Sequence, residues 1–141
     1  MRLATLAVGL LFAMFAPAKA ADASSRHLAL GEVAVVPTAA AYVAPELRAD
    51  LDDEIRALDL RGARKDAILS VSLVRLDTER AKGSDAATCV VSATLRSRNG
   101  GVLFAVLEGR ARAQGASGHV SESALRGAVH GALSRVPEAL R

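Results

Sequence analysis

The chain has 141 residues, of which 51% are hydrophobic, 3% aromatic and 23% charged, with 18 Lys and Arg against 15 Asp and Glu. This length is typical of one domain. The single cysteine excludes an internal disulfide, and the few aromatic side chains exclude the stacking platforms that bind single-stranded nucleic acid.

The first twenty residues have the pattern of a secretory signal peptide. Arg2 is followed by an apolar run that ends at Phe15, and Ala18 to Ala20 form an A-x-A cleavage site. The apolar run is shorter than the roughly 20 residues that a membrane-spanning helix needs. We therefore expect residues 1–20 to be removed and residues 21–141 to form one small domain, periplasmic or secreted.

Processing changes what the composition implies. It removes Arg2 and Lys19, so the remaining charges nearly balance and a nucleic-acid partner is not indicated. Tyr42 and Phe104 are the only aromatic residues that remain. Ala21 stands where a lipoprotein would carry its lipid-bearing cysteine, so we expect neither a lipid anchor nor a membrane span after cleavage.

Two elements are predicted in the first half of this domain. The run from Leu28 to Val36 is rich in β-branched residues and is ended by Pro37, which indicates a strand. Pro45 is well placed to open a helix that runs to about Leu60. Its apolar residues recur at intervals of four, four and three, as one helix face requires: Leu47, Leu51, Ile55 and Leu58.

Three strands follow, at Ala67 to Leu76, Ala87 to Leu95 and Val102 to Ala113. In the second of them small and apolar residues alternate with mostly polar ones, which places the odd-numbered residues on the core side. A three-residue loop, Arg98 to Gly100, keeps apolar residues opposite one another. It pairs Leu95 with Leu103, Ala93 with Ala105, Val91 with Leu107, and Cys89 with Gly109.

A second helix is predicted after a glycine-rich connector. Ser121 is the expected N-cap, and the helix ends or kinks near Pro137. Its buried stripe comprises Leu125, Ala128, Val129, Ala132 and Val136. Gly127 and Gly131 are costly in a helix, so we expect them where helix and sheet backbones approach closely.

This order predicts an α+β fold: a two-layer sandwich in which a four-stranded, mostly antiparallel sheet (β-α-β-β-β-α) carries two helices on one face. The outline resembles that of small accessory domains of the bacterial cell envelope, and no family motif accompanies the resemblance.

Candidate reactive residues favour structural roles. Cys89 has no histidine near it in sequence or in the predicted ladder, so a buried structural thiol is expected rather than a nucleophile. His27, His119 and His130 lack metal-ligand spacing and are interpreted as surface residues. The acidic cluster Asp50, Asp52, Asp53 and Glu54 is interpreted as a solvated helix face, with Asp52 positioned to pair with Arg56. We expect no metal, no cofactor and no enzymatic activity.

One surface suggests a binding role. Both helices cover one side of the sheet, so the other side is left uncovered with an apolar set ringed by polar and charged residues: Val74, Leu76, Val90, Val102, Phe104 and Val106. We therefore expect an exported, non-enzymatic accessory or adaptor domain of the envelope that binds a protein partner or itself through this face. The alternatives are a small periplasmic carrier of an apolar ligand such as a lipid, and an enzyme of unrecognised type.

Overall fold

The computed structural model describes residues 26–116 and 118–141, so the predicted signal peptide and the start of the mature chain lie outside the described residues. The elements run β1 (Leu28–Ala34), α2 (Val43–Ala57), β2 (Ala67–Ala81), β3 (Ser84–Ser97), β4 (Leu103–Gly115), α3 (Val120–Leu133) and α4 (Val136–Ala139). No helix within these residues is long and apolar enough to cross a membrane.

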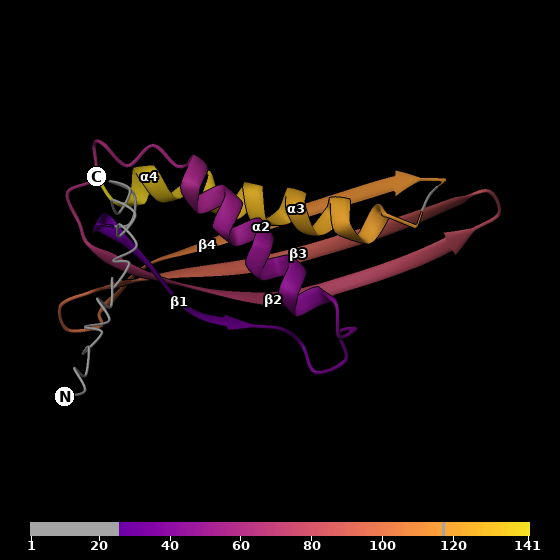
Figure 1. Cartoon of the computed structure of the whole chain (residues 1–141), viewed down its shortest axis with the longest axis horizontal. Helices are drawn as coiled ribbons and strands as arrows, with labels where there is room; N and C mark the ends of the chain where they lie inside the picture. The colour runs from indigo at the N-terminus through magenta and orange to yellow at the C-terminus, as the bar shows by residue number, and fades with distance from the viewer. Residues whose placement is uncertain (1–25, 117) are drawn as a thin grey trace, which may run out of the picture.

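The four strands form one sheet in the order β1-β2-β3-β4 (Figure 1). β1 runs parallel to β2, and the two remaining pairs are antiparallel. A helix between β1 and β2 is what a parallel pair needs, and short hairpins join the antiparallel strands. The predicted α+β sandwich with a mostly antiparallel sheet is confirmed.

The predicted register between β3 and β4 is wrong by two residues. Leu95 pairs with Ala105, Val91 with Gly109, and Cys89 with Ala111. The loop contains four residues rather than three, because the amide of Ser97 donates to the carbonyl of Val102, and both loop glycines adopt positive φ. A β-bulge between Leu95 and Arg96 adds the second residue of the shift. Since the total shift is even, β4 beyond this bulge keeps its predicted faces.

Both long helices begin before their predicted starts. α2 starts at Val43, two residues ahead of Pro45, and α3 starts at Val120 with His119 at the N-cap, so the assignment of Ser121 as N-cap is wrong. Neither helix has a side-chain cap hydrogen bond. α3 ends at Leu133, and the single turn of α4 contains Pro137 in its first positions, which agrees with the expected end or kink there.

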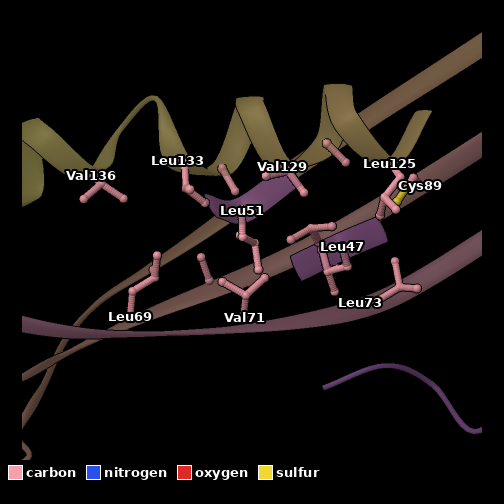
Figure 2. Close-up of a cluster of buried hydrophobic side chains, with 14 of the residues drawn as sticks. Leu47, Leu51, Leu69, Val71, Leu73, Cys89, Leu125, Val129, Leu133 and Val136 are labelled. Atoms are coloured by element: carbon pink, nitrogen blue, oxygen red, sulfur yellow. The ribbon is translucent and has the colours of Figure 1, made fainter. Parts of the chain in front are cut away.

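The core lies between the helices and the sheet (Figure 2). Leu47 and Leu51 of α2 point toward β2, and α3 supplies Leu125, Val129 and Leu133 from above the strands. The predicted stripe of the second helix is buried throughout, whereas Ile55 and Leu58 are half-buried.

Small residues bring α3 very close to β4. A Cβ added to Gly109 would lie 1.8 Å from the carbonyl oxygen of Ala128 and 2.6 Å from the amide nitrogen of Ala132. A Cβ at Gly127 would lie 2.9 Å from that of Ala111, and Gly131 faces Gly109. The prediction that the helix glycines mark a close approach of helix and sheet is confirmed.

Candidate functional site

The open face is the side of the sheet opposite the helices. On β3 it is formed by the residues between the buried ones, Thr88, Val90, Ser92 and Thr94. Val90 is the one apolar residue among these four, and the other three carry hydroxyl groups, so the apolar residues of β2 and β4 do not form one continuous patch across β3.

Three of the predicted face residues are exposed. Val74 is 52% exposed, Val102 64% and Val106 60%. Leu103 is a fourth exposed apolar residue, at 45%, which the sequence interpretation placed on the core side. It pairs with Arg96 on β3, so Leu103 and Val106 form an exposed apolar strip at the start of β4.

Val90 lies on the face but is only 7% exposed. In the ladder it stands between Arg75 of β2 and Arg110 of β4. Long arginine side chains commonly cover apolar neighbours with their aliphatic stems while the charged ends stay in water. A partner on this face would therefore meet the arginine ends before it met Val90.

Leu76 lies on the other side of the sheet. A β-bulge between Leu73 and Arg75 inserts Val74 as an extra residue, after which Leu76 pairs with the buried Cys89. Leu76 is half-buried and packs against the hydrophobic core. Its expected place on the open face is wrong, because one extra residue reverses the side to which every later side chain points.

Phe104 also packs against the core rather than on the open face. It is the extra residue of the bulge in β4, since Ala105 pairs with Leu95 and Leu103 with Arg96. Lys65 Nζ lies 5.4 Å from the centre of the phenyl ring and 3.3 Å from the carbonyl oxygen of Ala139 in α4. The ring is therefore half-buried at the end of the sheet that carries α4.

The remaining part of the open face carries ion pairs. Arg75 bonds to Asp77 along β2, Arg110 lies 3.8 Å from Glu108 along β4, and Arg112 reaches across β3 to Glu79 at 3.5 Å. Toward the β2–β3 turn the carboxylates stand on β2 and the guanidinium groups on β4. Near this turn, the β2 side of the open face is therefore negative and the β4 side is positive.

Cys89 is fully buried on the helix side, opposite Ala111 rather than the expected Gly109. Burial raises the pKa of its thiol to about 11, because the charged thiolate is disfavoured in an apolar environment. The thiol is therefore neutral at physiological pH and a poor nucleophile.

The acidic residues of α2 are not all solvated. Asp50 is 9% exposed and lies 3.3 Å from Arg126 of α3, while Glu54 lies 3.1 Å from His130. Burial raises the pKa of Asp50, and Arg126 partly opposes that shift. The interpretation of Asp50 as solvated is wrong. The sequence does contain a signal for this contact between the helices: Asp50 and Glu54 are four residues apart on one helix, and Arg126 and His130 are four residues apart on the other.

The outer face of α2 is solvated as expected, but Arg56 pairs with a different carboxylate from the one expected. Asp52 and Asp53 are exposed. Arg56 pairs with Asp53 at 3.7 Å, three residues earlier, rather than with Asp52, four residues earlier. Both spacings bring side chains together on a helix, and exposed pairs of this kind contribute little to stability.

Each of the three histidines bonds to a carboxylate: His27 to Asp66 at 2.7 Å, His119 to Glu122 at 3.1 Å, and His130 to Glu54. They come from separate parts of the fold. Within residues 26–116 and 118–141, no three His, Cys, Asp or Glu gather in a group that could hold a metal ion.

No protein-family model and no curated protein sequence matches the chain. Among solved structures, a candidate lipoprotein from Caulobacter crescentus is 15% identical, with 77% of this chain and 86% of that chain covered and a TM-score of 0.47. A Xanthomonas campestris protein of family DUF330 is 20% identical, with 79% of each chain covered and a TM-score of 0.45. The PelC dodecamer from Paraburkholderia phytofirmans is 17% identical, with 78% and 87% covered and a TM-score of 0.45. At these values the likeness carries no argument about the function of this chain.

Proposed function

We propose that this chain is an exported, non-enzymatic adaptor domain of the cell envelope that associates through the open face of its sheet with a second copy of itself. The signal-peptide pattern supports export to the periplasm or beyond. The observation that carries the proposal is the apolar strip of Leu103 and Val106, exposed on a sheet face that no described helix covers.

The arrangement of the open face accommodates a second copy as the occupant. Two copies facing each other and related by a half-turn about an axis along the strands place β2 of one against β4 of the other. Asp77 of one copy then meets Arg112 of the other, and the apolar strip meets the start of β2. Arg75 of one copy meets Arg110 of the other, and each of these two arginines keeps a carboxylate partner on its own strand. A symmetric interface of this kind needs one surface that is complementary to itself.

The reactive side chains of the described residues support a binding role rather than catalysis. The only thiol is buried and neutral. Each histidine is engaged with a carboxylate from its own surroundings, and the three lie apart. A nucleophile and a general base within hydrogen-bonding reach of each other are what covalent catalysis requires.

Sedimentation of the mature protein tests the association. We expect a concentration-dependent dimer that Val106→Asp weakens by about 30-fold or more, as for a residue central to an interface. Tyr42→Asp is the matched control, because Tyr42 is 53% exposed and lies at the start of α2, away from the open face. The control should dimerise like the parent.

Exchanging the charges of Asp77 and Arg112 tests whether the dimer uses the open face rather than another surface. Asp77→Arg and Arg112→Asp should each weaken the dimer, and the double variant should recover most of the loss because opposite charges again face each other. A parent protein that stays monomeric at its highest soluble concentration overturns self-association. A dimer indifferent to all of these changes overturns the assignment of the face.

A further inference from the structure

A hollow of about 390 Å³ lies at the end of the sandwich where the chain enters β2. The segment before β2 lines one side with Arg64, Lys65 and Asp66. The β3–β4 hairpin lines the other side with Ser97, Asn99, Val102 and Phe104. In Figure 1 this is the end that holds α4 and the C-terminus.

Backbone hydrogen bonds hold both sides of the hollow in place. The amides of Arg64 and Lys65 both donate to the carbonyl of Leu140, at 2.7 and 3.1 Å, and the amide of Arg98 donates to the carbonyl of Asp66 at 3.0 Å. Within the hairpin, the hydroxyl of Ser97 donates to a carbonyl of the same turn at 2.9 Å. The hollow is therefore built on the ends of ordered elements, which limits the entropy lost when a ligand binds.

The charges at this hollow are unbalanced. The carboxylate of Asp66 accepts a hydrogen bond from His27, whereas Lys65 Nζ, among residues 26–116 and 118–141, contacts a carbonyl oxygen and the face of Phe104 but no carboxylate. Within the described residues, neither Arg64 nor Arg98 makes an ion pair, and both are exposed. Guanidinium and ammonium groups without carboxylate partners attract phosphate groups, which they bind by charge-assisted hydrogen bonds.

Apolar side chains stand directly beside these cations. Val102 and Phe104 line the hollow, and Val102 is 64% exposed. A free inorganic anion would gain nothing from them, because it has no apolar part. A lipid surface offers both a phosphate and the start of an acyl region, and peripheral proteins bind it with this combination of cations and exposed apolar residues.

We propose that this hollow is a binding site for the phosphate of an anionic phospholipid headgroup. Arg64 and Lys65 hold the phosphate, Arg98 lies among the neighbouring headgroups, and Val102 enters the membrane interface. The site lies at the end of the molecule and does not use Leu103, Val106, Asp77 or Arg112, so its failure would leave the proposed dimer untouched, and failure of the dimer would leave the site untouched.

Vesicle sedimentation of the mature protein tests the site. We expect binding to phosphatidylglycerol vesicles and little to phosphatidylcholine vesicles. Arg64→Glu should weaken the binding by about 30-fold, because each basic residue at an anionic membrane contributes about fivefold and the change reverses one charge. Lys82→Glu changes the net charge equally at the β2–β3 turn, at the opposite end of the sheet, and should have a much smaller effect.

A titration with glycerol phosphate, followed by amide chemical shifts, distinguishes a lipid from a free phosphate. Saturation by glycerol phosphate together with indifference to vesicles shows a free phosphate ligand and overturns the lipid assignment. Equal losses for Arg64→Glu and Lys82→Glu show that net charge alone drives binding and overturn the site. Equal binding to both kinds of vesicle does the same. A circular dichroism spectrum matching that of the parent confirms that each variant is folded.

Discussion

The two faces of the sheet are made from neighbouring residues of the same strands, yet they impose very different constraints. On the covered face, Gly109 leaves no room for a single methyl group beneath α3. On the open face, the adjacent residues Glu108 and Arg110 extend into solvent and make one long ion pair with each other. A residue's effect on folding is therefore set by the side of the sheet it faces, since packing is close on one side and water fills the other.

Among substitutions that test this difference between the two faces, we expect Gly109→Ala to lower the free energy of unfolding most. The new Cβ would clash with the backbone of α3, which cannot move aside as a side chain could. We expect a loss of more than about 4 kcal/mol in the free energy of unfolding, measured by urea denaturation. Gly115→Ala is the control on the same strand, because its Cβ would make only an ordinary contact of 3.8 Å. Similar losses for both variants would contradict the close approach.

The next effect compares one apolar residue from each face. Leu125→Ala removes a fully buried side chain from α3, and we expect a loss of about 3 kcal/mol. Val106→Ala, at an exposed position, should change the free energy of unfolding by less than about 0.5 kcal/mol. Measuring both at a concentration where the protein is monomeric separates folding from association. A large loss for Val106→Ala alone in the monomer would show that the open face is covered from within the chain.

The sequence predicted the covered face well, because periodicity survives small errors in register. The stripe from Leu125 to Val136 is buried as expected, and Gly127 and Gly131 lie at the close approach. Two β-bulges, at Val74 and Phe104, could not be predicted. A bulge shifts the alternation by one residue, but Leu73 and Val74 are both apolar, as is every residue from Leu103 to Leu107, so the sequence does not show which residue is the extra one. The position of a bulge depends on how a strand pairs with its neighbours.

The candidate site was predicted less well for the same reason. Val106 is exposed on the open face as expected, whereas Val102 is exposed at the hairpin, where it lines the hollow. Leu76 and Phe104 pack on the core because each lies at or just after a bulge. The basic hollow was not predicted at all, because Lys65 and Phe104 are 39 residues apart in the chain. Residues this distant meet only when the sheet and α4 bring the two segments together.

We expect a smaller loss of stability from substitutions at Cys89, and the reactivity of its thiol tests whether this side chain is buried on the covered face. Cys89→Ala should cost about 1 kcal/mol through lost packing, and Cys89→Ser about 2 kcal/mol, because it buries a hydroxyl group. The native thiol, whose pKa burial raises to about 11, should react slowly with iodoacetamide at neutral pH and quickly after denaturation. Rapid alkylation of the folded protein would contradict the burial of this side chain.

We expect the smallest effect on stability at the contact between α2 and α3, where acidic side chains of α2 are partly buried. The pKa of Glu46 is raised by partial burial and by Glu122, and the pKa of Asp50 is raised by burial. A raised pKa in the folded state means that the folded protein binds the proton more tightly than the unfolded chain does. The resulting stabilisation is complete below the unfolded pKa and is lost as the pH rises through the folded pKa.

Asp50→Asn sharpens this last comparison, because asparagine stays neutral at every pH. As the pH rises from about 4 to about 7, the parent should lose stability relative to the variant, since only the parent must bury a charge. Urea unfolding at several pH values measures the difference. Asp52→Asn, an exposed change on the same helix, controls for net charge. If the parent instead gains on Asp50→Asn as the pH rises, the ion pair with Arg126 outweighs the cost of burial and the direction assigned to the pKa of Asp50 is wrong.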